Sequence, residues 1–371
     1  LVRLLAAAGA PLTAWPELYP KHRAMGYTCT YVPEEIIHAA GFVPVRVRTT
    51  PQVPTHADAH LQSYTCALCR SALDQLLRGE LQFLAGMVLA HTCDTMQALA
   101  DLWVINAEPG NGWVETVMMP TNLASPNARP YLIAELERFR ARLAAHGGRP
   151  VGDEDLWASI TLYNEKRRLL NRLHALRDRL TAGEFYGVVD AGDRMPVELY
   201  VPLMMQLVEQ LEQALSTPGG PRLMLVGAVL DDPTLLGVLD ELGARVADDD
   251  LCTGTRSFAE PVTEEGDPIA ALADRALTRV LCPVKHRPES SRGAHLQRRV
   301  EEAQAEGVIF VLPKFCDPHA FDYVLVKSEL KADGVPFLHL ETEQTSTSGQ
   351  IRTRVQAFLE MLRGGTPVKH R

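Results

Sequence analysis

Seven cysteines are the residues of this 371-residue chain whose chemistry is most easily read. Their number is odd and they are spread over almost the whole length, so any scheme of internal disulfides would leave one thiol over. A chain this long can bury a sizeable core without cross-links, which favours free thiols or metal ligands over a disulfide scaffold. The seven are Cys29, Cys66, Cys69, Cys93, Cys252, Cys282 and Cys316.

Four of these cysteines fall where a predicted strand gives way to a predicted helix. Cys29 precedes the helix-like "PEEIIHAAG", Cys93 separates the apolar run "LQFLAGMVLA" from "DTMQALADLW", Cys252 follows "ARV" and an acidic stretch, and Cys316 follows "GVIFVL". Open α/β sheets bind ligands at the carboxyl ends of their strands, and helix N-termini stabilise thiolates. We therefore expect these four thiols to gather around one ligand. The alternative is that each is a small buried hydrophobe.

The spacing of the cysteines indicates which kind of metal centre would suit them. Only Cys66 and Cys69 form a C-x-x-C pair, whereas a zinc site favours two close pairs or a compact Cys/His set. No thioredoxin-like context surrounds that pair. Thiolates converging from separate loops suit an iron–sulfur cluster better, because its inorganic core can gather distant ligands. Gly254, two residues after Cys252, would let the backbone approach such a core closely.

Polar residues beside these cysteines each have a functional and a structural interpretation. The acidic run 248–250 before Cys252 either lowers the potential of a cluster or forms a solvated loop. The histidines near Cys93 and Cys316 are either proton donors or satisfied structural side chains. The carboxylates after Cys29 either face the cluster or stabilise the first turn of a helix. These side chains are His91, His319, Glu34 and Glu35.

Strand and helix signals alternate over residues 1–130 and again over 217–371, after the linker-like "STPGGP". Such alternation predicts parallel sheets covered on both faces. Residues 131–216 read as helices, with apolar residues at helical spacing, and are expected to pack on the sheets or on a sister subunit rather than to form a partner-binding coiled coil. The predicted fold class is α/β, with two doubly wound, flavodoxin- or Rossmann-like parallel-sheet domains and a helical insertion between them.

Composition and missing motifs exclude several functions. The formal net charge of −9 disfavours binding to nucleic acid or to an anionic membrane surface. No apolar run is long enough to span a membrane, and the opening "LVRLLAAAGAPLTAW" has too thin a basic region for a secretory signal, so a cytoplasmic location is expected. There is no G-x-x-x-x-G-K-[ST] or G-x-G-x-x-G, so ATP is expected on a partner and not on this chain.

Six segments together resemble the 2-hydroxyacyl-CoA dehydratase / benzoyl-CoA reductase superfamily. The resemblance covers nearly the whole chain, and its motifs keep their order. It implies an oxygen-sensitive iron–sulfur protein of two α/β domains, paired with a related sister subunit or a second copy of itself. It also implies an ATP-hydrolysing iron–sulfur activator that delivers electrons at low potential, and an acyl-CoA substrate. The segments are "GYTCTYVPEEIIHAAGFVPVRV", "TCALCRSALDQLLRG", "HTCDTMQALADLW", "DLCTGTR", "KFCDPHAFDY" and "LHLETEQTSTSGQIRTRVQAFLEML".

The resemblance also implies a set of cluster ligands. Dehydratase subunits of the superfamily hold one [4Fe-4S] cubane through three cysteines, which would match Cys29, Cys93 and Cys316, or the neighbouring Cys66. "DLCTGTR" and "VLCPVKH" resemble the double-cubane branch and ATP-dependent benzoyl-CoA reductases. With their two cysteines the candidate ligands could hold two cubanes joined by a bridging sulfide, [8Fe-9S]. The order C-x-x-x-R-S favours Cys66 over Cys69, although a swap stays open. The six candidates are Cys29, Cys66, Cys93, Cys252, Cys282 and Cys316.

The resemblance predicts an oxidoreductase: the cluster-bearing subunit of an ATP-dependent reductase, passing single electrons from the activator to an aromatic acyl-CoA. One alternative is a homodimeric double-cubane reductase of small molecules without a CoA substrate. Another is a 2-hydroxyacyl-CoA dehydratase subunit, a lyase in which the electron is recycled. A third is a non-catalytic electron carrier whose sister subunit binds CoA. No catalytic residue or proton donor is assigned from the sequence.

Overall fold

The computed structural model describes residues 1–371 except 108–111, 217–218, 280, 343–347 and 365–371. Its described strands form two parallel four-stranded sheets, ordered β2-β1-β3-β4 and β6-β5-β7-β8. Each sheet therefore runs outward in both directions from its first strand, which confirms the predicted doubly wound α/β class. The strands are β1 Ala24–Tyr27, β2 Val43–Arg46, β3 Leu84–His91, β4 Val114–Met118, β5 Arg222–Gly227, β6 Arg245–Asp250, β7 Gly307–Pro313 and β8 Phe337–Thr342.

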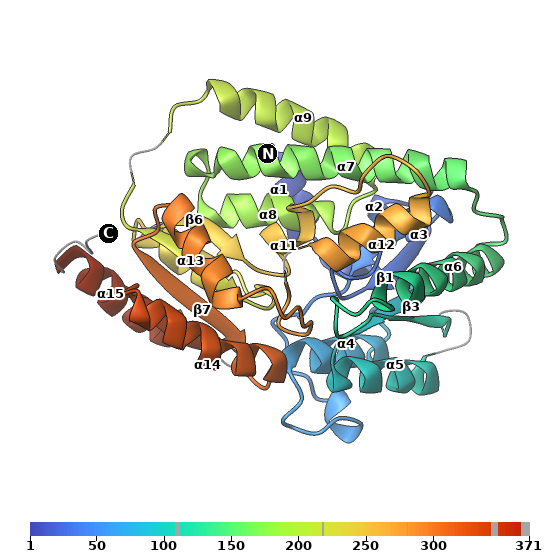
Figure 1. Ribbon diagram of the computed structural model, residues 1–371, viewed down its shortest axis with the longest axis horizontal. Helices are drawn as coiled ribbons and strands as arrows, with labels where there is room; N and C mark the ends of the chain where they lie inside the picture. Colours follow the sequence, from blue (N-terminus) through green and yellow to red (C-terminus); the bar gives the residue numbers. More distant parts are fainter. Residues whose placement is uncertain (108–111, 217–218, 280, 343–347, 365–371) are drawn as a thin grey trace.

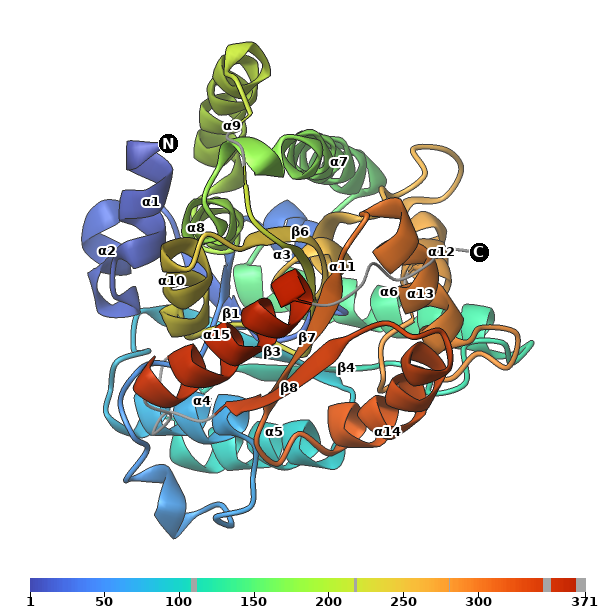
Figure 2. The same ribbon diagram turned by 90° about the vertical axis from the view of Figure 1, so that its left-hand side faces the viewer.

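Helices cover both faces of the second sheet. Leu223 and Leu225 of β5 pack toward α10 and α15, while Met224 and Val226 pack toward α13 and α14 (Figure 2). Because alternate side chains of the strand enter different cores, residues 223–226 of β5 read as one unbroken apolar run. The helices are α10 Thr234–Glu241, α13 Arg292–Glu302, α14 Asp317–Ala332 and α15 Ser348–Gly364.

The first sheet is covered in the same way. Met25 and Val88 pack toward α3 and α6, and Val45 and Leu89 pack toward α4 and α5 (Figure 1). The short helix predicted after Cys29 corresponds to α3. The helices are α3 Glu34–Ala39, α4 Ala67–Leu77, α5 Asp94–Asn106 and α6 Ala128–Gly147.

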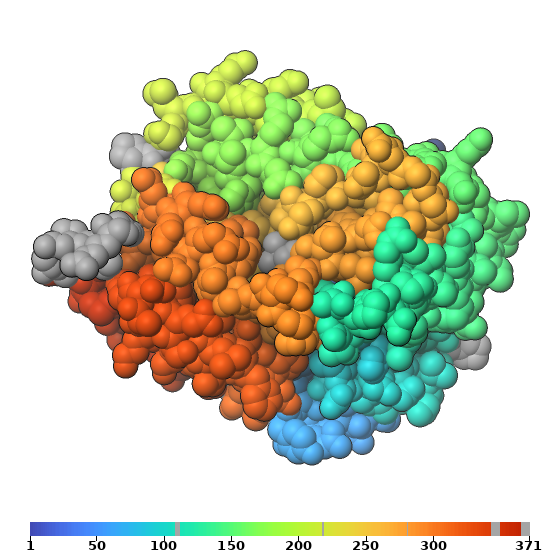
Figure 3. All heavy atoms as spheres, in the orientation of Figure 1, coloured from blue at the N-terminus to red at the C-terminus, as the bar shows by residue number. Residues whose placement is uncertain are grey.

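A layer of helices lies across the two sheets, as expected for residues 131–216 (Figure 1). The N-terminal helix α1 packs on α8 and buries Leu4 in the core of this layer. In the other direction, α12 of the second α/β run packs on α6, which begins the helical range and covers the first sheet (Figure 3). Helices from the first and from the last of the three sequence ranges therefore pack on helices of the middle range. The elements are α1 Val2–Gly9, α2 Trp15–Leu18, α7 Asp153–Ala175, α8 Ala182–Gly192, α9 Val197–Gln213, α11 Thr255–Phe258 and α12 Pro268–Thr278, with 3₁₀ turns at Leu12–Ala14, Ala57–Ala59 and Arg177–Arg179.

Among the helices that the structure describes, none has the length and apolar character needed to cross a bilayer.

Arg48 joins the first sheet to the helical layer and to the second sheet. It lies just beyond β2, and its guanidinium pairs with Asp190 of α8 and, through Nε at 2.6 Å, with Asp231 beyond β5. Its Nη2 also donates to the Leu230 carbonyl at 2.7 Å. The Arg48 and Asp231 side chains are 10% and 3% exposed, so water cannot take the place of either partner. Removing the cation would leave the Asp231 carboxylate buried without an ion-pair partner, while Asp190 would keep its pair with Arg194 at 3.0 Å.

We expect Arg48→Met to lower the free energy of unfolding by about 3–5 kcal/mol, the usual effect of removing one partner of a buried ion pair. Urea denaturation of the iron-free chain measures it. Arg129→Met is the matched control, because Arg129 makes a similar two-pronged pair with Asp274 but both side chains are about half exposed. That change should cost at most about 1 kcal/mol. An equal loss of unfolding free energy in the two variants would contradict the assignment of Arg48 as the residue that joins the first sheet to the helical layer and the second sheet.

Candidate functional site

The cysteines lie at the carboxyl edges of the two sheets, beside the central strands. Cys29 follows β1 and Cys93 follows β3, the two strands between which the winding direction of the first sheet reverses. Cys316 follows β7 in the second sheet. Cys252 follows β6, but its backbone N–H donates to the Ala228 carbonyl at 2.6 Å and so holds it at the end of the central strand β5. Both reversal points, where open α/β sheets bind ligands, thus carry thiols.

Three of the cysteines are helix N-caps. Cys66, Cys93 and Cys316 stand immediately before α4, α5 and α14. The N–H groups of the first turn lie near each sulfur: those of Leu68 and Cys69 act to lower the pKa of Cys66. An N-terminal first turn is the part of a helix that stabilises negative charge. The expected position at a helix N-terminus is confirmed for Cys93 and Cys316, and Cys66 takes the same position without having been expected there.

Two pairs of thiols lie close together, and within each pair one thiol lowers the pKa of the other. Cys282 lowers the pKa of Cys252 to about 5. Cys69 lowers the pKa of Cys66 to about 7. The second pair comes from one C-x-x-C turn, whereas Cys252 and Cys282 lie thirty residues apart in the sequence and are brought together by the fold. All seven cysteines are free thiols.

The remaining thiols also lie within electrostatic reach of one another. Burial, and then the negative charge of Cys252, raise the pKa of Cys29. Burial raises the pKa of Cys93 to about 11, and the charges of Cys66 and Cys29 add to this. Burial also raises the pKa of Cys316, with further contributions from Cys66, Cys93 and Cys252. Thiols from the two α/β halves of the chain therefore converge on one region.

We group the six predicted ligands by their strongest mutual interactions, while weaker ones join the groups, from Cys29 to Cys93 and from Cys252 to Cys316. Cys29, Cys252 and Cys282 form one group, here called the Cys252 triad, since Cys252 acts on Cys29 and Cys282 acts on Cys252. The other group, the Cys66 triad, contains Cys66, Cys93 and Cys316, because Cys66 is the thiol that acts most strongly on the other two. Each triad takes thiols from both halves of the chain. The assignment of the six as ligands stays a prediction.

A single metal ion needs its thiolate ligands about 2.3 Å from one point. No three His, Cys, Asp or Glu side chains in the described part of the chain are close enough to hold one. The ligands of an iron–sulfur cubane bind different irons and so do not have to converge on one point. The spread of the two triads is compatible with such a core.

Buried cations surround the Cys252 triad, and sequence reasoning did not find them. Arg256 Nη1 donates to Cys252 Sγ at 3.3 Å, and Arg46 Nη1 donates to the Cys252 carbonyl at 3.0 Å. Arg279 donates to the Thr30 carbonyl at 2.6 Å, next to Cys29. Their positive charges offset the charge of thiolates taken out of water. Only Arg256 had a local signal, four residues after Cys252 in "DLCTGTR".

Two buried donors beside the Cys252 triad have no partner among the described residues: Arg46 Nη2 and Tyr31 Oη. The Tyr31 ring lies between cations, with Arg279 at 5.0 Å and Lys285 at 5.6 Å from its centroid. Leaving a buried donor unpaired costs about 1–3 kcal/mol, and such groups are uncommon in native proteins. Both are therefore suited to an acceptor that a bound group would bring, such as the sulfide of a cluster.

The acidic run before Cys252 is not a solvated loop. Residues 248–250 belong to β6 and are at most 3% exposed. Asp250 pairs with Arg256 and Arg292, each at 2.7 Å, and Asp248 pairs with Arg299 through its Nε at 2.6 Å. The prediction of a loop was wrong because arginines distant in sequence neutralise these carboxylates inside the sheet, which also offsets the negative charge that would act on a cluster.

Gly254 makes room for a carboxylate of this network. A side chain at residue 254 would collide with the Asp249 carboxylate, which lies where the Cβ would be. That carboxylate accepts the Thr255 N–H at 2.8 Å and so holds the turn after Cys252. The interpretation of Gly254 as space for an inorganic core stays a prediction.

The two glutamates after Cys29 face the helical layer instead of the thiols. Glu34 Oε1 accepts a hydrogen bond from Lys166 Nζ at 3.0 Å. Glu35 is buried and pairs with Arg167. Both partners lie on α7, so these carboxylates tie α3 to that helix, and the structural interpretation holds.

The two histidines beside cysteine loops differ in their surroundings. His91, the last residue of β3, bonds through Nε2 to Oε1 of Gln97 on α5 at 2.7 Å. His319 is buried and lies with Nδ1 3.4 Å from Cys316 Sγ and Nε2 3.4 Å from Arg256 Nη1. Of the pair, His319 thus has the direct link to a thiol.

Phe315 holds an unusual backbone conformation immediately before Cys316, with φ of 63°. A bulky residue in the left-handed region is uncommon and costs of order 1–3 kcal/mol, so it persists only where the surroundings impose it. This turn places Cys316 at the start of α14.

A cavity of about 200 Å³ lies between the two sheets, beside the helix that Cys66 caps. Ala67 and Leu68 line it on one side, Thr50 and Asp231 on others, and Pro313 closes the end of β7. It has room for a small group, and it is below the roughly 300–1,000 Å³ of typical ligand pockets.

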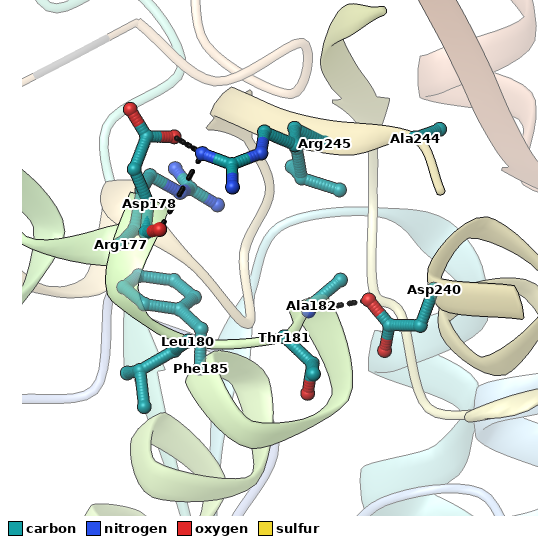
Figure 4. Close-up of a pocket in the computed structure, with 10 residues that line it drawn as sticks. Arg177, Asp178, Leu180, Thr181, Ala182, Phe185, Asp240, Ala244 and Arg245 are labelled. Carbon is teal, nitrogen blue, oxygen red and sulfur yellow. Dashed lines mark hydrogen bonds and ion pairs between the residues drawn. The ribbon is translucent and has the colours of Figure 1, made fainter. Parts of the chain in front are cut away.

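A second hollow, between α8, α10 and β6, is shown in Figure 4. It is bordered by the Arg245–Asp178 ion pair and by the bond from the Ala182 N–H to Asp240. Its volume of about 30 Å³ holds little more than water. None of the six predicted ligands lines it, so it is not the functional site.

We expect gentle oxidation of the iron-free chain to form disulfides Cys252–Cys282 and Cys66–Cys69 in at least half of the molecules, because the two thiols of each pair lie close enough to act on each other's pKa. Peptide mass mapping identifies the links. Cys252→Ser should abolish the first link and leave the second intact. A dominant link from Cys282 to any other cysteine in the native chain would contradict the geometry of the Cys252 triad.

Comparison with known proteins gives the chain a family. Residues 29–362 match the family model described as "2-hydroxyglutaryl-CoA dehydratase, D-component". The chain is 27% identical over 346 residues to the (R)-phenyllactyl-CoA dehydratase beta subunit of Clostridium sporogenes, covering 92% of each chain. It is 28% identical over 361 residues to one of the subunits of benzoyl-CoA reductase from Thauera aromatica, covering 94% of this chain and 93% of that one. It is also 26% identical to the (R)-2-hydroxyglutaryl-CoA dehydratase subunit beta of Acidaminococcus fermentans, with 92% of each covered. The chain therefore belongs to the 2-hydroxyglutaryl-CoA dehydratase D-component family, whose members include subunits of acyl-CoA dehydratases and reductases.

Proposed function

We propose that this chain is the iron–sulfur subunit of an ATP-dependent, low-potential reductase resembling benzoyl-CoA reductase. In this proposal each triad holds one cubane and a sulfide joins the two, so the chain carries a double-cubane cluster. The observation that supports it is the gathering of six thiols into two groups of three, each drawn from both halves of the chain.

The residues around the triads fit a negatively charged inorganic core. Arg46 and Tyr31 offer unpaired buried donors, the groups that would bond to cluster sulfide. Arg256 and Lys285 lie close enough to the thiolates to interact with their charge. A bound cluster would supply reversible one-electron transfer, and protein-held clusters reach about −700 mV at the low extreme. The protein's contribution is the burial, the charges and the hydrogen bonds that set the potential.

The relatives' names support a role within a larger assembly. Each of the three relatives is named as one subunit of an enzyme, so we propose that this chain also works beside a sister subunit or a second copy. The sequence has no phosphate-binding motif, which is why ATP hydrolysis is assigned to a separate activator. We assign the acyl-CoA thioester to the assembly, with electrons delivered to it from this chain.

The extra thiols favour a reductase over a dehydratase in this proposal. A single cubane needs three cysteines of the chain, and the Cys66 triad alone would supply them. The Cys252 triad is then a second set that a single-cluster dehydratase subunit would not need. Buried cations and unpaired hydrogen-bond donors lie beside the Cys252 triad. Such polar surroundings do not suit cysteines that only fill space in an apolar core.

We expect anaerobically purified protein to contain about eight irons and about nine sulfides per chain, the content of two bridged four-iron cores. Cys252→Ser and Cys282→Ser should each lower the iron content to about half or less, since each removes a ligand of one core. Colorimetric iron and acid-labile sulfide counting measures this.

Cys69→Ser is the matched control, because Cys69 is buried in the apolar core and lies close enough to Cys66 to lower its pKa. The iron content should differ from the native value by no more than about 20%, because this side chain is not expected to bind iron. An iron-free native protein would overturn the proposal, and about four irons unaffected by Cys252→Ser would reduce it to a single cubane.

Electron balance separates a reductase from a dehydratase. Loss of water from a 2-hydroxyacyl-CoA is redox-neutral, so a dehydratase recycles its electron over many turnovers. Reduction of a substrate consumes electrons with every product molecule. We expect the complete assembly to oxidise its reductant in proportion to product, as measured with a dye of known extinction. Product formation with only catalytic amounts of reductant would assign the chain to the dehydratases.

A further inference from the structure

His319 occupies a position in the site that the proposed function leaves unexplained. It lies in the first turn of α14, three residues after Cys316, and its ring is buried. Nδ1 is 3.4 Å from Cys316 Sγ, and Nε2 is 3.4 Å from Arg256 Nη1. The imidazole therefore links a thiol of the Cys66 triad to the arginine that contacts the Cys252 triad.

The Arg256 guanidinium is held in a fixed orientation. Its Nε and Nη2 donate to the two carboxylate oxygens of Asp250 at 2.7 and 2.9 Å, and Nη2 also donates to the Gly227 carbonyl at 2.9 Å. With these bonds made, Nη1 is directed both at Cys252 Sγ, 3.3 Å away, and at His319 Nε2. Arg256 is 2% exposed, so water does not compete for these bonds.

This contact determines which ring nitrogen of His319 carries the proton. A guanidinium has only donors, so the nitrogen facing Arg256 Nη1 has to be an acceptor. Nε2 is therefore unprotonated, and in the neutral ring the proton sits on Nδ1, which faces Cys316 Sγ. The Gly227 carbonyl, which accepts Arg256 Nη2 at 2.9 Å, also lies near the ring and is the competing acceptor for a ring N–H.

We propose that His319 is a positioning residue that donates its Nδ1–H to the Cys316 sulfur and raises the reduction potential of the cluster held by the Cys66 triad. This inference rests on the proposed function. A hydrogen bond to a ligating sulfur stabilises the more negative, reduced state of a cluster. Arg256 reaches both triads, because it contacts Cys252 directly and fixes the tautomer of the histidine that contacts Cys316.

The test is an anaerobic redox titration of the full-length, cluster-loaded chain, followed by electron paramagnetic resonance. His319→Phe removes the donor and should lower the ratio of reduced to oxidised cluster at least tenfold at a fixed potential, which is about 59 mV for a one-electron couple. His319→Asn places an amide N–H near the position of Nδ1 and should restore the ratio to within about threefold of native.

His91→Phe is the matched control, since His91 also adjoins a cysteine loop but bonds to Gln97. It should leave the potential unchanged. A native potential in His319→Phe at native iron content would overturn the inference, as would a loss in His319→Asn as large as in His319→Phe.

The tautomer itself gives a second readout that does not need the cluster. Nitrogen NMR of the iron-free chain labelled at histidine should show the His319 proton on Nδ1, with His319→Asn identifying the signal. A proton on Nε2, donating toward the Gly227 carbonyl, would overturn the inference even if the phenylalanine variant fails to load iron. Because iron content is measured in the same native sample, an absent cluster counts against the proposed function alone.

Discussion

The burial of several thiols at one junction is the constraint on which the rest of the site depends. Thiolates close together repel one another and lose solvation, so each needs compensation from the protein. The chain supplies this compensation with two arginines that contact Cys252, Arg256 and Arg46. Asp250 pairs with the first guanidinium and Asp193 with the second. Asp250 inside β6 is thus connected through Arg256 to the thiol that follows the strand.

The two sheets solve the same positioning problem twice. Each sheet places a thiol beyond the carboxyl end of its third strand in chain order: Cys93 after β3 and Cys316 after β7. Each of these cysteines is the N-cap of the helix that follows. The end of the first strand carries Cys29 directly in one sheet, and in the other it receives Cys252 through a backbone hydrogen bond to Ala228. The same strand order therefore yields an equivalent sulfur position by two different local routes.

Local patterns in the sequence predicted the strands, the helices and the cysteines at their junctions, because periodicity and capping depend on neighbouring residues. They did not predict the cations, since Arg46 lies 206 residues from the Cys252 carbonyl it contacts. The acidic run 248–250 was misread for the same reason: two of its arginine partners, Arg292 and Arg299, follow some forty to fifty residues later. The contact of Gly254 with Asp249 was missed because nothing local shows that Asp249 folds back over it.

Each triad takes its sulfurs from both halves of the chain, and this limits how the molecule can move. A rigid inorganic core bound in this way would fix the two sheets to each other. The ion pairs of Arg48 join the same two parts of the molecule. Hinge-like opening of the halves would then break metal–sulfur bonds instead of bending a linker. If the chain works as proposed, a conformational change that drives electron transfer to low potential would have to occur in a partner that binds to this chain. The chain itself would transfer the electrons without changing shape.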